Sequence, residues 1–240
     1  MDRMIYNSMA GAKAAMQRQE VLAHNLANVT TTGFRAELQA FRAVPVRGDG
    51  ASTRVYALET TIGYDDKAGP LQTTARNLDV AVKGKSWLSV QGLDGTEAYT
   101  RAGALDVNAE GLLVTRGGLP VLGDGGPITI PPNSEIQIGE DGTVSAKGAT
   151  GRPANVGRLK LVTPEERMTR GEDGLFRTVD PLPADPNARL EAGVLEGSNV
   201  SAVETMVSMI SAARQFEQQM KLLNIAQTQG QVSAKLLSPT

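Results

Sequence analysis

The chain has 240 residues, a formal net charge of −2 and 40% hydrophobic residues, enough for one large domain or two small ones with a folded core. The balanced charge has no basic stripe, which argues against nucleic acid as a partner. Because there is no cysteine and only one histidine, His24, disulfides, thiolate metal sites and histidine-rich metal centres are excluded.

The first residues, MDRMIYNSMAGAKAAM, interrupt any apolar run with Asp2 and Lys13, unlike the apolar segment of a cleaved signal peptide. No stretch approaches the roughly 20 apolar residues of a membrane span. We therefore expect a cytoplasmic protein, or one that is exported without a cleaved signal.

A long helix is predicted over about residues 3–28, because apolar and small residues recur at alternating steps of four and three. Such a heptad stripe predicts lengthwise packing on a partner helix, and its members are candidates for a subunit interface. The stripe consists of Ile5, Met9, Ala12, Met16, Gln19, Ala23 and Leu26.

The helix ends in the segment NLANVTTTGFR, residues 25–35. Asn28 is suited to stopping the helix in a left-handed conformation. Thr30–Thr32 favour an extended chain, Gly33 permits a positive φ, and Phe34 can anchor the departing chain. The segment therefore predicts a rigid exit from the helix.

The helical period is absent from about residue 71 to 195. An extended linker is predicted over 31–75 and a β-rich domain over 76–197. Strands are predicted at 78–82, 87–91, 97–103, 112–115, 128–130, 135–138, 143–146 and 157–162. Turn dipeptides, which predict hairpins, are Asp94-Gly95, Glu110-Gly111, Asp124-Gly125, Asp141-Gly142 and Asp173-Gly174.

A second long helix is predicted in the C-terminal segment. Ser198 or Ser201 can cap it, and Glu204 stands at the capping-box distance from Ser201. Its heptad stripe comprises Met206, Met209, Ala213, Phe216, Met220, Leu223 and Gln227, and continues through Gly230, Ala234 and Leu237.

Each terminal helix has only one apolar stripe to bury, so the two are expected to meet. The predicted fold class is α+β: a discontinuous helical domain, residues 1–30 plus 198–240, forms a coiled-coil-like pair with an all-β domain inserted between its halves. Because the stripes contain Met, Ala, Gln and Gly, they fit either an intramolecular core alone or additional packing against copies of the chain.

No pattern for catalysis or for a cofactor is found, and no metal or small-molecule substrate is expected. The segment GGLPVLGDGG lacks the lysine of a phosphate-binding loop and is interpreted as consecutive turns. The acidic pairs Glu165-Glu166 and Glu172-Asp173 lie in polar, loop-like surroundings rather than in a dry pocket. An enzyme is therefore the weaker hypothesis, and Trp87 is interpreted as a core residue.

Three segments carry a resemblance to a known family. NLANVTTTGFR resembles the motif that ends the first helix of bacterial flagellar axial proteins, the rod and hook family. LEGSNVSAVETMVSMI, residues 195–210, is similar to that family's C-terminal signature, and residues 98–123 resemble its middle strands. The opening MDRMIY followed by SMAGA looks most like the proximal-rod members. Thr32 stands where many relatives carry proline.

The resemblance implies a structural subunit of the flagellar rod, the drive shaft between motor and hook. It implies export without cleavage through the flagellar type III apparatus, a place in the periplasmic basal body, and partners among copies of itself and other rod proteins. The terminal helices would form an inner tube. The helix–linker joints would be Asn25, Asn28, Gly33 and Phe34 on the way out and Ser198, Asn199 and Val200 on the return.

Two alternatives remain open. One is a distal-rod or hook homologue at another axial position, which contacts with neighbours in isolated basal bodies would reveal. The other is a non-polymerising β-domain binding module with a helical stalk, favoured if the purified monomer kept both helices ordered.

Overall fold

The computed structural model describes residues 2–45, 55–148 and 151–237, which fall into two compact units. The helical unit comprises residues 1–29, 37–64 and 200–240, and the β unit comprises residues 30–36 and 65–199. The predicted α+β class is confirmed, with two terminal helices packed together and a β-rich region between them in the sequence.

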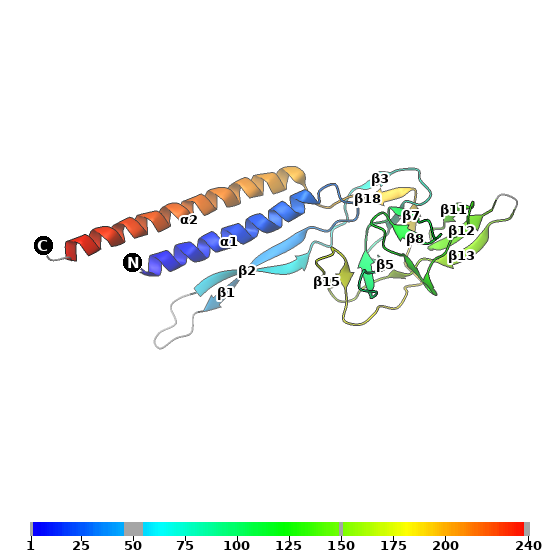
Figure 1. Ribbon diagram of the computed structural model, residues 1–240, viewed down its shortest axis with the longest axis horizontal. Coiled ribbons are helices and arrows are strands. Elements are labelled where there is room, and N and C mark those ends of the chain that lie inside the picture. The colour runs from blue at the N-terminus through cyan, green and yellow to red at the C-terminus, as the bar shows by residue number, and fades with distance from the viewer. Residues whose placement is uncertain (1, 46–54, 149–150, 238–240) are drawn as a thin grey trace. The chain divides into compact units, whose positions relative to one another are not determined.

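The helical unit is built on two long antiparallel helices, α1 (Asp2–Ala27) and α2 (Ala202–Leu237), which lie side by side with the start of α1 and the end of α2 at the same end (Figure 1). Ser201 caps α2, since its hydroxyl accepts the backbone N–H of Glu204 at 3.4 Å, which confirms one of the two predicted caps. Because isolated helices are marginal in water, this pairing is what stabilises both of them.

A two-stranded hairpin completes the helical unit. Strands β1 (Glu37–Pro45) and β2 (Val55–Tyr64) pair antiparallel and run along α1 (Figure 1). The Gln39 side-chain amide donates to the backbone carbonyl of Gln17 in α1 at 3.2 Å.

This hairpin lies in the segment 31–75, for which the sequence predicts an extended linker. The structure differs there, because residues 37–45 and 55–64 form paired strands and group with the helices. The two strands depend on each other and on packing against α1, which local composition does not reveal, so a segment rich in charge, proline and glycine points to a loop instead.

The β unit consists of short antiparallel strands. One sheet has the order β14-β5-β6-β16-β15, a second has the order β11-β12-β13, and the remaining strands form pairs. The strands are β3 (Leu71–Thr73), β4 (Val80–Val82), β5 (Trp87–Gln91), β6 (Glu97–Thr100), β7 (Leu105–Val107), β8 (Leu113–Thr115), β9 (Leu122–Gly123), β10 (Gly126–Pro127), β11 (Glu135–Ile138), β12 (Thr143–Lys147), β13 (Ala154–Arg158), β14 (Leu161–Val162), β15 (Thr169–Arg170), β16 (Phe176–Arg177), β17 (Leu190–Ala192) and β18 (Val194–Glu196).

All the predicted turn dipeptides join antiparallel neighbours. They connect β5 to β6, β7 to β8, β9 to β10, β11 to β12 and β15 to β16, so these hairpin predictions are confirmed. In three of the turns the aspartate side chain accepts the backbone N–H two residues later, at 3.0 to 3.1 Å. In these three turns the residues of the turn itself therefore stabilise the connection.

Some strand predictions differ from the structure. Residues 128–130 make only an isolated bridge at Thr129, and the predicted strand 157–162 is divided between β13 and β14. The pairs β3–β18 and β4–β17 join the beginning of the β unit to its end. The predicted strand 78–82 contains β4, but β3, β17 and β18 are too short for a period-2 pattern, and both pairings are long-range.

One apolar cluster forms the core of the β unit. It includes Val80, Leu88, Val90, Leu105 and Leu113, all fully buried. Trp87 is buried as predicted.

Candidate functional site: helix faces and helix joints

The seam between α1 and α2 is lined by small side chains. The buried positions are Ser8, Ala12 and Ala15 on α1 and Thr205, Ala212 and Ala226 on α2. Gln219 occupies the heptad position between Ala212 and Ala226, and a Cβ at Gly11 would lie 2.9 Å from its side-chain carbon. Small residues at these positions let the two helices approach closely.

Apart from Ala12, which belongs to both, the predicted stripe is displaced by one residue from the buried seam on the two helices. Ser8 is buried whereas Met9 is exposed, and Thr205 is buried whereas Met206 is exposed. Of the predicted interface residues, Ala12 is buried; Ile5, Leu26, Met209, Ala213, Phe216 and Leu223 are half-buried; Met9, Met16, Gln19, Ala23, Met206, Met220 and Gln227 are exposed. A sequence pattern assigns methionine to the core because it is apolar. The close approach of α1 and α2 instead favours Ser, Thr and Ala at their contact.

The exposed part of the predicted stripe forms one surface of the helix pair. Successive residues of an α-helix are about 100° apart, so a position one residue beyond the seam lies on its flank. In an antiparallel pair, flanks displaced in the same sense on both helices face the same side. We call this side the methionine face; it carries Met9, Met16, Met206 and Met220.

A second apolar surface lies on α2. Val203, Met206, Val207 and Ile210 are spaced i, i+3, i+4 and i+7, which places them on one side of the helix, and each is at least half exposed. The buried Thr205, Ala212 and Ala226 of the same helix point toward α1. Helix α2 is therefore apolar on more than the face that α1 covers. We call these four residues the outer patch.

The end of α1 is held by two asparagines. The buried Asn25 amide donates to the Glu37 carbonyl at 3.0 Å and accepts the Glu37 N–H at 2.9 Å. The Asn28 amide donates to the His24 carbonyl at 2.9 Å, which caps the last turn of the helix. His24 Nδ1 also lies 3.3 Å from Glu37 Oε2.

The expected conformation after α1 is wrong in two respects. Among the described residues, the only non-glycine residues with positive φ are Ala75 and Asn133, so Asn28 acts through its side chain and not through a left-handed backbone. Residues 30–32 lie in bends and turns rather than in an extended chain.

Gly33 does have the predicted positive φ, 69°. Its N–H donates to the Glu196 carbonyl at 2.7 Å. A Cβ at this position would lie 2.2 Å from the Arg101 carbonyl carbon and 2.5 Å from the Ala102 nitrogen. Glycine is therefore required both for the backbone conformation and for the close approach of two backbones.

Phe34 and Asn199 fasten the same region of the β unit. Phe34 is buried with the Arg170 guanidinium 4.4 Å from its ring centroid. The Asn199 amide accepts the Ala36 N–H at 2.7 Å and donates to the Asp65 carbonyl at 3.0 Å, while the Asn199 N–H donates to the Phe34 carbonyl. One side chain thus links three segments at which the chain passes from one unit to the other. Of the other predicted return-joint residues, Ser198 is buried and Val200 half-buried.

A buried charge cluster, which the sequence did not indicate, lies beside Gly33. Arg35 Nη2 and Glu196 Oε1 are 2.7 Å apart, and both side chains are almost completely buried. Glu196 Oε1 also accepts the Gly69 N–H at 3.0 Å, and Arg101 Nε lies 3.5 Å from Glu196 Oε2. Arg35 Nη1 donates to the carbonyl of Lys67. Removing one partner would leave an uncompensated buried charge.

Arg101 belongs to the same cluster and is held by main-chain carbonyls. It donates to Val82 at 2.9 Å, to Ser86 at 2.8 Å and to Gly84 at 2.5 Å, and its guanidinium lies 5.5 Å from the Trp87 ring centroid. Arg35 is the last residue of NLANVTTTGFR and Glu196 lies in LEGSNVSAVETMVSMI, but nothing in their local pattern marks a charged residue as buried.

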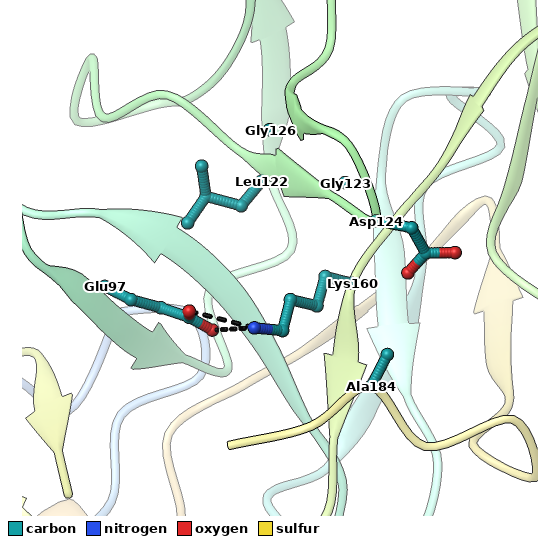
Figure 2. Close-up of a pocket in the computed structure, with 7 residues that line it drawn as sticks. All are labelled: Glu97, Leu122, Gly123, Asp124, Gly126, Lys160 and Ala184. Carbon is teal, nitrogen blue, oxygen red and sulfur yellow. Dashed lines mark hydrogen bonds and ion pairs between the residues drawn. The ribbon is translucent and has the colours of Figure 1, made fainter. Parts of the chain in front are cut away.

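The β unit also has an open hollow of about 480 Å³. Figure 2 shows the Lys160 ammonium directed at the Glu97 carboxylate, at 2.7 and 2.9 Å, rather than at Asp124. The fully buried Ser89 hydroxyl donates to the same carboxylate. The glycine-rich stretch expected to form consecutive turns supplies Leu122, Gly123, Asp124 and Gly126. The Lys160 and Glu97 charges in this hollow are paired with each other, so the Lys160 ammonium is not left to bind an anion.

Within the described ranges, no group of His, Asp or Glu side chains is arranged to hold a metal ion. In the same part of the chain, neither helix is long and apolar enough to cross a membrane.

Comparison with known proteins matches three family models along the chain. "Flagella basal body rod protein" matches residues 5–35, "Flagellar hook protein FlgE/F/G D1 domain" matches residues 81–146, and "Flagellar basal body rod FlgEFG protein C-terminal" matches residues 191–236. These ranges contain most of α1 together with Gly33, the central strands, and Glu196 with most of α2.

Curated relatives cover nearly the whole chain. The flagellar basal-body rod protein FlgF of Salmonella typhimurium is 48% identical over 93% of this chain and 93% of its own length. FlgF of Escherichia coli is 46% identical over 99% of both chains, and FlgG of Agrobacterium fabrum is 30% identical over 98% of this chain and 99% of its own. The chain is more similar to these FlgF proteins than to this FlgG. It therefore belongs to the flagellar basal-body rod protein family and is a structural subunit of that rod.

Proposed function

We propose that this rod subunit assembles into a helical polymer through its helix pair, with the methionine face and the outer patch as the surfaces that contact neighbouring subunits. The single observation that carries this proposal is that α2 is apolar on sides that α1 does not cover, at Val203, Val207 and Ile210. An exposed apolar patch that the rest of the chain leaves uncovered marks a surface for contact with another protein chain.

The energy available on the outer patch is sufficient for this role. Burying a Val, Ile or Met side chain completely contributes about 1.5–3 kcal/mol. Since each of the four residues is at least half exposed, covering the patch would contribute on the order of 4 kcal/mol per subunit. A head-to-tail contact that does not close into a ring repeats along a filament, so the same gain recurs at every subunit.

The predicted joint residues have a matching role in this proposal. Asn25 and Asn28 fix the end of α1, while Gly33, Phe34, Ser198, Asn199 and Val200 hold the chain where it enters and leaves the β unit. The hydrogen bonds of Asn199 to Ala36 and Asp65 support this assignment. Torque transmission requires that these connections resist deformation.

The proposal extends to location and partners. The subunit would act in the periplasmic part of the basal body, beside copies of itself and other rod proteins, after export through the flagellar type III apparatus without a cleaved signal. The lack of cysteine suits an oxidising compartment. The higher identity to FlgF supports a proximal position in the rod, and a distal position is the alternative. A scaffold without catalytic activity is in keeping with the relatives' names.

The test is a charge placed on the outer patch. In a strain lacking its own copy, Val207→Glu should be absent from isolated basal bodies, because a carboxylate in an apolar interface loses its hydration without a paired cation. Gln215→Glu, at an exposed position on a different side of α2, is the matched control and should be incorporated. Both variants should keep the wild-type unfolding of the β unit, monitored by Trp87 fluorescence. Normal incorporation of Val207→Glu would refute the interface assignment.

A further inference from the structure

The methionines differ sharply in exposure. Among those whose side chains the structure describes, the relative exposures are 57% for Met9, 49% for Met16, 50% for Met206, 39% for Met220 and 3% for Met168, and Met209 is half-buried. Of these methionines, the four on the methionine face are thus the most exposed, whereas Met168 lies buried in the β unit.

We propose that the methionine face is a site of reversible oxidation that controls whether a subunit can be incorporated. The oxidant is hydrogen peroxide. A sulfur lone pair of the methionine attacks one peroxide oxygen, the O–O bond breaks as the S–O bond forms, and a proton shift releases water. The sulfur is oxidised by two electrons to the sulfoxide while the peroxide is reduced by two.

The site is accessible only before assembly. In the free subunit the four methionine residues are exposed to solvent. In the polymer the neighbouring subunits cover them; this second statement rests on the proposed function. A sulfoxide converts a flexible apolar side chain into a polar one, which disrupts methionine-rich interfaces and is reversed by methionine sulfoxide reductases. Oxidised subunits are therefore excluded until they are reduced.

The first measurement requires only the purified chain. Peroxide is added to the folded protein, and sulfoxide formation at each methionine is followed by peptide mass spectrometry. Met9, Met16, Met206 and Met220 should be oxidised about tenfold faster than Met168, which serves as the internal control. Equal rates at exposed and buried positions would overturn the site assignment, whatever the chain assembles into.

The second measurement tests the effect on assembly. A variant with Met9→Leu, Met16→Leu, Met206→Leu and Met220→Leu keeps an apolar surface of similar volume but cannot be oxidised there. Wild type and this variant are produced together in one cell, with and without peroxide, and their ratio in isolated basal bodies is measured by mass. General damage to export or to other rod proteins affects both forms equally.

Peroxide should lower the wild-type share about tenfold, and sulfoxide reductases should restore it. An unchanged ratio, while the free wild-type pool carries sulfoxides, would overturn the control of assembly. That result is separate from failure of the proposed function, which would appear as normal incorporation of Val207→Glu without any oxidant.

Discussion

Gly33 offers the sharpest test of the joint, because the chain contains a glycine with nearly the same backbone conformation in open space. Gly33 has a φ of 69° and Gly84 has a φ of 67°. A Cβ at Gly84 meets no atom within 4 Å, whereas a Cβ at Gly33 lies 2.2 Å from the backbone of Arg101. Replacing each glycine with alanine therefore separates the penalty of the backbone conformation from the penalty of the collision.

The expected magnitudes differ clearly. Gly84→Ala should lower the free energy of unfolding of the β unit by about 1–2 kcal/mol, the penalty of a left-handed backbone for a residue with a Cβ. Gly33→Ala carries the same penalty and must also displace the main chain of Arg101, whose side chain belongs to the buried cluster. Gly33→Ala should lower the free energy of unfolding by more than about 4 kcal/mol, a loss that single substitutions reach only through severe packing faults.

Urea unfolding followed by tryptophan fluorescence is the assay, since Trp87 is the single tryptophan and lies in the β unit. The difference between the two variants gives the contribution of the close backbone approach. If both alanine variants lost the same stability, the contact between Gly33 and Arg101 would not matter and the reasoning would be refuted. The result also bears on bulkier changes: Gly33→Val should destabilise the β unit itself, and not only prevent incorporation into the rod.

Three further predictions use the same unfolding assay. Ala75 has a φ of 56°, so Ala75→Gly should raise the free energy of unfolding by about 0.5–1 kcal/mol, and a loss of stability would contradict the assigned strain. Hydrogen bonds, the largest from the Thr143 hydroxyl, hold the pKa of Asp141 below its ordinary value of 3.8. The charged carboxylate therefore stabilises the fold at pH values above 3.8, and this stabilisation is lost as the pH falls through the lower pKa of the folded state. Asp141→Asn should reduce the loss of stability in acid. An unchanged dependence of unfolding on pH would argue against this role of Asp141. Glu196→Gln leaves buried arginine charge uncompensated and should lose about 3–5 kcal/mol, whereas the exposed control Glu191→Gln should lose less than about 1 kcal/mol; similar losses would contradict the importance of burial.

The hairpins of the β unit could be predicted from short stretches of sequence. At Asp94-Gly95 and Asp141-Gly142 the glycine supplies the positive φ and the aspartate accepts a nearby backbone N–H, so each turn is specified by its own residues. The same holds for the Ser201 cap and for the positive φ of Gly33. The existence of both long helices also followed from the sequence, because their periodicity extends over many turns.

Tertiary structure decided what each of these elements contacts. The seam of the helix pair lies on Ser8 and Thr205 rather than on Met9 and Met206, because the closeness of the two helices favours small side chains over apolar ones. That shift of one residue leaves the methionines on the surface.

The buried charge cluster and the β1–β2 hairpin beside α1 also could not be predicted from the sequence. Arg35 and Glu196 stand 161 positions apart by their residue numbers, and only the folded chain brings opposite charges together so that both can be buried. Strands β1 and β2 depend on each other and on α1 for their hydrogen bonds and packing. Local chemistry thus determined the turns, the cap and the helices, while the pairing of distant segments determined which side chains became core, joint or free surface.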